Sequence, residues 1–256
     1  DVLQSLIDHT VELVKLGHHV IVVHGAGSFG HVLAKQWDLS SGLSGTFVDS
    51  QRLEVVEEVR DNMDHLCRHV VEVFYERMME EGVSSIDNLT PVVQVTSHTP
   101  REFLTNTGYN FDGDLSRFVE IDPRLDDILH VTHGDVVDCE LPKGFGILSG
   151  DHIMYRLATE LPDVTHCIFA MDEPGILTSP DARGELIPSW SRDMGINGAL
   201  DEEMDVTGGI FLKTDVASRI SESVEHVWFI DGKCPERMLE IVQNGNTIGT
   251  RINPSR

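Results

Sequence analysis

The pattern of apolar and polar positions alternates between a helical and a strand period from the start of the chain. Residues 2–16 place apolar side chains at helical spacing, and Gly17 follows as a helix stop. Residues 20–23 are a short run of β-branched side chains, which predicts a strand buried on both faces. Residues 52–81 then form a longer amphipathic helix with one apolar side. The chain thus begins as helix, strand and helix in turn.

The remainder of the chain continues this alternation. Further strands are expected at residues 91–95, 128–131, 164–170, 227–230 and 249–252, further helices at 151–161, 209–221 and 235–244, a hairpin at 136–147, and loops at 96–127 and 179–204. Strands that alternate with helices favour a mainly parallel sheet covered on both faces. We therefore predict a single domain over residues 1–256, built as a three-layer α/β/α sandwich around an open, mainly parallel sheet.

Composition narrows the class of protein. No apolar run approaches the roughly 20 residues that cross a bilayer, and the amino end lacks the order of a signal peptide. The 4 cysteines lie far apart, without the spacing of a zinc knuckle or a disulfide framework. We expect a cytoplasmic protein without a membrane partner.

Charge excludes a further class of partner. With 43 acidic and 19 basic residues the net charge is −24, which would repel nucleic acid. The excess is either a solvated acidic surface or an adaptation to a salty cytosol, where screening weakens self-repulsion. In both cases an anionic substrate must bind to one of the protein's few positive groups. A lysine or histidine beside a glycine-rich loop is therefore a stronger indication of a binding site.

The clearest candidate for chemistry is the turn between the first strand and the next helix, His24-Gly-Ala-Gly-Ser-Phe-Gly-His31. Its glycines and Ala26 leave room for the backbone to approach a ligand, and the amides of a helix start attract anions. The spacing fits neither a Walker loop nor GxGxxG. The turn predicts a phosphate cradle, with a tight turn that needs glycine only for its geometry as the alternative.

Two more helix starts carry glycine. Ser149-Gly150-Asp151 precedes the helix at 151–161, where we expect Asp151 to act as N-cap. Gly208 and Gly209 open a helix that bears Lys213, which suits the oxygens of a nucleotide tail unless the lysine is merely solvated. All three helix starts follow strands, so we expect them at the carboxyl edge of one sheet.

Together with Asp172-Glu-Pro-Gly175 and Gly249-Thr250, these motifs resemble the isopentenyl phosphate kinases of the amino acid kinase superfamily, in order and spacing, from residue 2 to 252. His31 resembles the histidine that distinguishes this branch from carboxylate and UMP kinases. The resemblance implies transfer of the γ-phosphoryl group of ATP to isopentenyl phosphate, giving isopentenyl diphosphate for isoprenoid synthesis, with Mg²⁺ bridging the ATP oxygens. Because relatives are commonly dimers, it also implies a homodimer.

The same resemblance implies roles for individual residues. It assigns catalysis to His31, Lys213 and Asp151; contacts with the acceptor phosphate to Ala26, His31 and Gly150; contacts with the hydrocarbon tail to Val136 and Ile147; and the ATP site to Gly27, Asp172, Gly175, Gly208, Gly209 and Lys213. No side chain is implied as a metal ligand. Residues 1–150 would hold the acceptor and residues 151–256 would hold ATP.

The predicted tail site has a second wall on the helix at 52–81. Val56, Val59 and Met63 form an apolar stripe there, which we expect to meet Val136 and Ile147 over a five-carbon tail. Packing in the core is the simpler interpretation of such a stripe.

Two departures from the family pattern are visible. The family opens with a strand ending in Lys-x-Gly-Gly-Ser, which this sequence lacks. We therefore expect a fragment that lacks a central strand and at least one catalytic positive charge. His152 stands where many relatives carry an acid. Two alternatives therefore stay open: another phosphate or phosphonate kinase of the superfamily, similar to fosfomycin kinase, and a catalytically inactive nucleotide-binding module.

Overall fold

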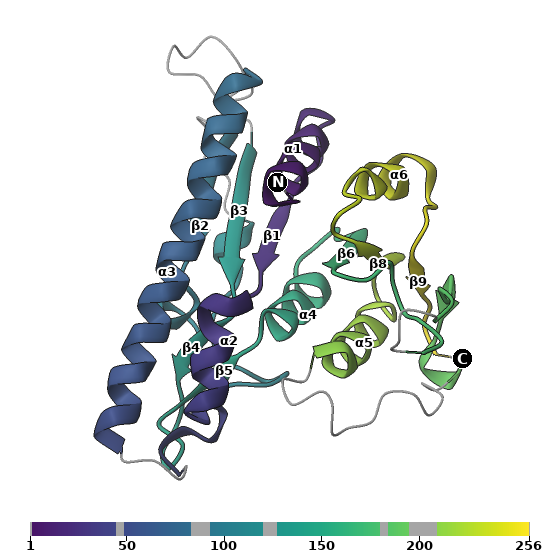
Figure 1. Ribbon diagram of the computed structural model, residues 1–256. Coiled ribbons are helices and arrows are strands. Elements are labelled where there is room, and N and C mark those ends of the chain that lie inside the picture. The colour runs from purple at the N-terminus through teal and green to yellow at the C-terminus, as the bar shows by residue number, and fades with distance from the viewer. Residues whose placement is uncertain are drawn as a thin grey trace. The chain divides into compact units, whose positions relative to one another are not determined.

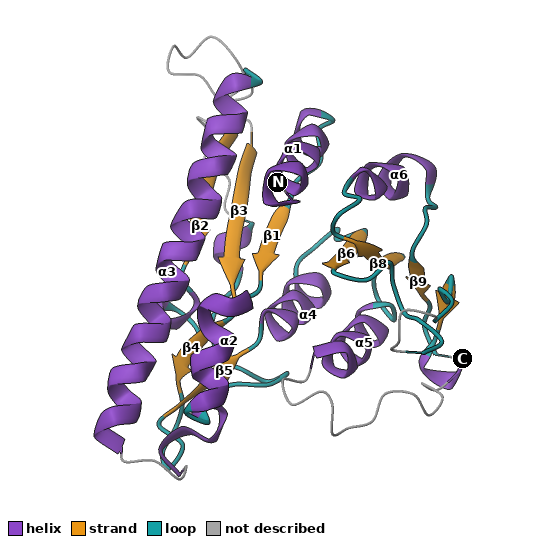
Figure 2. Ribbon diagram, viewed as in Figure 1, coloured by secondary structure: helices purple, strands orange, loops and turns teal. Residues whose placement is uncertain are grey.

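The computed structural model describes residues 2–44, 49–82, 93–119, 127–179, 184–194 and 209–255. The chain forms two compact units, residues 14–154 and residues 1–13 with 155–256. Helices and strands alternate in both units, and the sheets are open and mainly parallel, as predicted (Figures 1 and 2).

The described helices and strands match the predicted ones with ends shifted by a few residues, except that a short strand, Ser189–Trp190, lies in the stretch 179–204 that was predicted to be a loop. The α-helices are α1 (Val2–Lys15), α2 (Gly27–Gln36), α3 (Asp49–Glu80), α4 (Gly150–Glu160), α5 (Gly209–Ile220) and α6 (Glu236–Asn244). The strands are β1 (Ile21–His24), β2 (Val93–His98), β3 (Asp127–His133), β4 (Asp135–Asp138), β5 (Phe145–Leu148), β6 (His166–Met171), β7 (Ser189–Trp190), β8 (His226–Asp231) and β9 (Thr250–Ile252). Short 3-10 helices lie at Leu39–Ser44, Pro100–Glu102, Ser116–Phe118 and Arg192–Met194.

The unit of residues 14–154 is built on a three-stranded parallel sheet in the order β1-β3-β2. The register pairs His24 with His133 and His98 with Thr132. Because the strands are parallel, these residues lie at the same carboxyl edge. The loops that follow β1 and β3 therefore begin side by side.

Helix α3 lies along this sheet, and α2 packs against α3 (Figure 1). Val56, Val59 and Met63 are at most 3% exposed, because they form the face of α3 that is turned into an apolar cluster. Strands β4 and β5 form the predicted antiparallel hairpin, with Val136 opposite Ile147. The hairpin thus presents its apolar side chains to α3.

The second unit contains a four-stranded sheet in the order β6-β8-β9-β7. Strands β6 and β8 are parallel, β8 and β9 antiparallel, and β7 and β9 parallel. The strands expected in one sheet are thus divided between two sheets and a hairpin. Helices α5 and α6 both pack against β8. Within the described ranges, no helix combines the length and the apolar character needed to span a membrane.

Candidate functional site

The glycine-rich turn joins β1 to α2 with little side-chain cover. Helix α2 begins at Gly27, whose φ of 49° is in the left-handed region that favours glycine. Ala26 at the N-cap position makes no side-chain hydrogen bond to the helix, and its carbonyl accepts one from the Phe29 amide at 3.0 Å. A helix start without a side-chain cap leaves its amides available to an anion, so the phosphate cradle stays a prediction with which this geometry is compatible.

Gly30 and His31 lie on different faces of α2, one packed against α3 and the other exposed. A Cβ at Gly30 would lie 2.9 Å from the Cβ of Ala26 and 3.5 Å from the sulfur of Met63, so glycine allows α2 to lie close to α3. His31 is the next residue and is exposed. Close packing at residue 30 thus holds in place the turn of the helix that presents the imidazole.

The second predicted glycine site adjoins the first. A Cβ at Gly150 would lie 3.3 Å from Val23 Cγ1 and 3.6 Å from both the His24 carbonyl oxygen and the Gly134 nitrogen. The Gly134 amide donates to the His24 carbonyl at 3.3 Å. The ends of β1 and β3 and the start of α4 therefore converge, and the candidate phosphate contacts Ala26 and Gly150 come from neighbouring segments.

Gly134 was missed in the sequence, although it is essential to this convergence. A Cβ on it would lie 2.9 Å from the Gly150 nitrogen, closer than two such atoms can approach. The available signal was that Gly134 follows a buried strand, as Gly25 does after β1.

The predicted N-cap of α4 is wrong by two residues. The helix begins at Gly150, and the Ser149 hydroxyl accepts a hydrogen bond from the Asp151 amide at 3.2 Å. Ser149 is therefore the cap, because only a residue before the first helical position can reach that amide. Asp151 lies inside the first turn and is 8% exposed. A carboxylate in that position is stabilised by the helix dipole.

His152, on the same turn, packs edge-on against the ring of Tyr109, with ring centroids 4.8 Å apart. Burial lowers the pKa of His152. Its Nδ1 is buried and, within the part of the chain that the structure describes, has no hydrogen-bond partner. The lowered pKa favours the neutral imidazole, which is enclosed beside Tyr109 at the start of α4.

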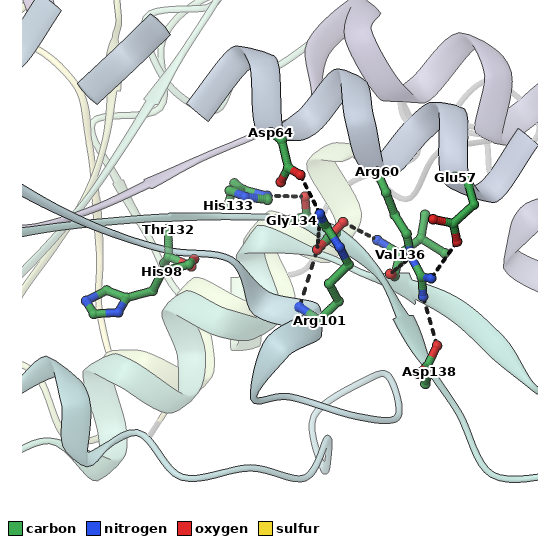
Figure 3. A network of polar contacts seen from close by, with 11 residues as sticks. Glu57, Arg60, Asp64, His98, Arg101, Thr132, His133, Gly134, Val136 and Asp138 are labelled. Carbon is green, nitrogen blue, oxygen red and sulfur yellow. Dashed lines mark hydrogen bonds and ion pairs between the residues drawn. The ribbon is translucent and has the colours of Figure 1, made fainter. Parts of the chain in front are cut away.

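His24 is also neutral. Burial lowers the pKa of His24 to about 4, with a smaller lowering by His133 and an opposing contribution from the Gly25 carbonyl. The rings of His24 and His133 lie 5.1 Å apart, and the Nδ1 of His24 is 3.1 Å from the Gly25 carbonyl oxygen. The Nδ1 of His133 is likewise 3.0 Å from the Gly134 carbonyl oxygen (Figure 3). Positive charge for an acceptor phosphate must therefore come from a residue other than His24.

The predicted tail-contacting residues meet in one apolar cluster. Val136 and Ile147 of the hairpin lie there with Val56, Val59 and Met63 of α3, and Ala26 packs against the same cluster. The α3 members and Val136 are almost fully buried, so core packing describes most of their surface. Ala26 and Ile147 are only half-buried. The cluster thus reaches the glycine-rich turn through Ala26.

The candidate ATP residues lie mainly in the other unit. Asp172 directly follows β6, and its carbonyl accepts a hydrogen bond from Lys233 Nζ at 3.2 Å. Lys233 follows β8, the parallel neighbour of β6, and was missed in the sequence. The sequence offered one sign of Lys233: a lysine closely follows a predicted buried strand, in a chain with few lysines.

Gly175 has a packing reason to be glycine. Its φ is 152°, and a Cβ there would lie 2.4 Å from Thr250 Oγ1. That hydroxyl accepts from the Ile176 amide at 2.8 Å and donates to the Ile187 carbonyl at 2.6 Å. Thr250 therefore fixes the turn after Gly175.

The last predicted glycine site is described in part. Gly209 is the first residue of α5, as expected, and Lys213 lies half-buried in the second turn of that helix. Gly208 lies outside the described residues. Gly27 and Asp151 belong to the unit of residues 14–154, whereas Asp172, Gly175, Gly209 and Lys213 belong to the other. Among described residues, no group of three or more His, Cys, Asp or Glu is arranged to hold a metal ion.

Comparison with known proteins decides the family. The family described as "Amino acid kinase family" matches residues 1–231. The chain belongs to the amino acid kinase family. It is therefore a phosphotransferase of this family, and its relatives support ATP as the donor.

Individual relatives differ in the acceptor that their names give. An isopentenyl phosphate kinase of Thermoplasma acidophilum is 30% identical over 236 residues, which cover 91% of this chain and 84% of that protein. An acetylglutamate kinase of Caulobacter vibrioides is 27% identical over an alignment of 272 residues including gaps, which covers 98% of this chain and 85% of that protein. A solved isopentenyl phosphate kinase shares the fold, with a TM-score of 0.72 at 20% identity over 97% of this chain and 90% of its own.

Proposed function

We propose that this kinase transfers the γ-phosphoryl group of ATP to isopentenyl phosphate, forming isopentenyl diphosphate and ADP. The observation that carries the proposal is the double contact of Ala26. This residue is the N-cap of α2 in the glycine-rich turn and also packs against the apolar cluster of α3 and the β4–β5 hairpin. An acceptor with a phosphate at one end and a short hydrocarbon chain at the other matches that arrangement.

In this proposal the acceptor phosphate is bound between the start of α2 and the start of α4. The backbone at Ala26 and Gly150 contacts its oxygens, and His31 donates a hydrogen bond to them. Asp151 is retained as a catalytic candidate because its buried carboxylate lies in the first turn of α4, next to Gly150. Val136 and Ile147 contact the tail.

ATP is bound by the other set of residues. Gly27, Asp172, Gly175, Gly208 and Gly209 line its site, and Lys213 neutralises its phosphate oxygens. Mg²⁺, entering with ATP, would supply further positive charge at these oxygens. Phosphoryl transfer needs little covalent assistance, so positioning and electrostatic stabilisation by these groups provide most of the rate. Apart from Gly27 and Asp151, residues 1–150 then serve the acceptor and residues 151–256 serve ATP.

The relatives' names also support a competing acceptor, the carboxylate of acetylglutamate. The apolar character of the cluster around Val136 favours a hydrocarbon tail over a second carboxylate, because a carboxylate in such surroundings must be paired to offset its desolvation. A compact phosphonate would need less of this apolar wall.

The test is ADP release by the protein expressed from its complete coding sequence, with Mg-ATP and one acceptor at a time. Isopentenyl phosphate should give the highest kcat/KM among isopentenyl phosphate, fosfomycin and N-acetylglutamate. The Lys213→Met variant should lose turnover by roughly tenfold or more, as for other removed electrostatic groups. Preference for fosfomycin or N-acetylglutamate would assign the enzyme to another branch, and no turnover with any acceptor would favour an inactive nucleotide-binding module.

A further inference from the structure

Two arginines connect the walls of the apolar cluster through polar contacts outside it. Arg60 lies on α3, and its Nε donates to the carbonyl of Val136 on β4 at 2.9 Å (Figure 3). The same guanidinium donates to Asp138 and Glu57, each at 2.8 Å. Its side chain is 15% exposed and is thus largely enclosed between α3 and the hairpin.

The second arginine connects the same two elements from the 3-10 helix Pro100–Glu102, which follows β2. Arg101 donates to Asp64 of α3 at 2.5 Å and to Asp135 of β4 at 3.0 Å (Figure 3). The Asp135 side chain is 0% exposed and also accepts from the Val136 amide at 2.8 Å. Burial alone would lower the pKa of Arg101, but the hydrogen bonds and charges of the two carboxylates raise it, so the bridge stays charged.

Both the backbone amide and the backbone carbonyl of Val136 are therefore hydrogen-bonded to side chains. Its amide donates to Asp135, its carbonyl accepts from Arg60, and its side chain is 2% exposed in the cluster with Val56 and Val59. Arg60 and Asp64 are four residues apart, so the two connections act on α3 about 6 Å apart along its axis. Two points of attachment fix the orientation of β4 relative to α3 as well as its distance.

We propose that Arg60 and Arg101 are positioning residues, which set the spacing between α3 and β4 and thereby limit the length of acceptor tail that enters between them. The inference rests on the proposed function, because it needs the tail to lie against Val136 and α3. Neither guanidinium has to touch the acceptor. A partly buried ion pair that brings two elements together determines geometry more than net stability, since desolvation offsets much of its attraction.

The decisive variant is Arg60→Met, which keeps most of the apolar stem and removes the donors to Val136, Asp138 and Glu57. We expect kcat/KM for geranyl phosphate, relative to isopentenyl phosphate, to rise by about tenfold, mainly through a lower KM for the ten-carbon acceptor. Arg60→Lys, which keeps one donor, should give an intermediate ratio. Arg68→Met is the matched control, because Arg68 is exposed on the same helix; its ratio should equal that of the parent.

Binding of geranyl phosphate by calorimetry, without ATP, gives a readout that does not depend on turnover. It should tighten in Arg60→Met and stay unchanged in Arg68→Met. A purely structural role would lower the melting temperature and weaken the binding of both acceptors equally. The inference is overturned if folded Arg60→Met and Arg101→Met keep the parent's ratio of kcat/KM for geranyl phosphate to that for isopentenyl phosphate. Failure of the proposed function is distinguishable, because the parent would then neither bind nor phosphorylate isopentenyl phosphate.

Discussion

The Nε2 atom of His98 lies 2.8 Å from the Nδ1 atom of His130, with the two rings stacked at the carboxyl half of the parallel sheet. Phe118 packs against both rings. The pKa of His98 is lowered to about 4 by burial, then by His130 and Arg117. In this contact one imidazole donates and the other accepts, and the lowered pKa keeps His98 neutral at neutral pH.

This pair predicts that the fold is less stable in acid. An unfolded histidine takes up a proton near its ordinary value of about 6.5, whereas folded His98 does so only near 4. Between these values the unfolded state holds more protons, so the free energy of unfolding falls as the pH is lowered from about 6.5 towards 4. His24, with its pKa also lowered to about 4, contributes in the same direction.

Urea unfolding at about pH 7.5 and about pH 5 measures this effect. The parent should lose stability between the two, and His98→Gln, which keeps a hydrogen-bonding group without titrating, should lose less. Equal losses in parent and variant would mean that His98 does not titrate abnormally.

The sequence was sufficient for the α-helices, for most of the strands and for the order of the glycine sites, because these depend on local patterns. Helical periodicity located α3, and a strand followed by glycine located the starts of α2 and α4. The Asp151 cap was wrong because N-cap identity depends on one residue of helix boundary, which periodicity does not resolve.

Contacts between segments that are distant along the chain could not be predicted from the sequence. Arg101 meets Asp64 and Asp135 only after folding brings the 3-10 helix Pro100–Glu102, α3 and β4 together. A charged residue on an amphipathic helix gives no sign of its partner. The same holds for Gly134, whose need for glycine comes from the approach of Gly150. Gly208 and the roles of the individual site residues stay predictions.

The convergence at Gly134 makes a prediction about stability. Gly134→Ala should destabilise the protein by about 1–3 kcal/mol, because its Cβ would meet the backbone nitrogen of Gly150, which cannot move without shifting α4. Gly25→Ala is the matched control, since a Cβ there meets nothing within 4 Å. Chemical denaturation of both variants checks this, and equal stabilities would contradict the close approach.

The apolar cluster predicts different results for two of its members. Ile147→Ala should raise relative activity on geranyl phosphate with a modest loss of stability, because Ile147 is only half-buried. Val56→Ala should chiefly destabilise, by about 1–3 kcal/mol, because Val56 is 2% exposed. Steady-state kinetics with both acceptors, alongside melting curves, separate the two effects. An Ile147→Ala enzyme that stays folded with the parental preference would place the tail elsewhere.

His31 predicts a loss of rate without a loss of folding. His31→Ala should lower turnover by about a hundredfold, by analogy with other removed electrostatic donors, and His31→Gln or His31→Asn should recover part of it. Because His31 is exposed, the melting temperature should stay close to that of the parent. Full activity in folded His31→Ala would remove the imidazole from the mechanism.

The most direct test of the account is phosphorus NMR of the reaction of the complete protein with isopentenyl phosphate and Mg-ATP. If the phosphate-binding turn at Ala26 and the adjoining apolar cluster form one acceptor site, the monophosphate signal should decay while the two coupled signals of isopentenyl diphosphate and those of ADP appear in equal amounts. An unchanged isopentenyl phosphate signal, with ATP consumed only when a carboxylate or phosphonate acceptor is added, would contradict the proposed function.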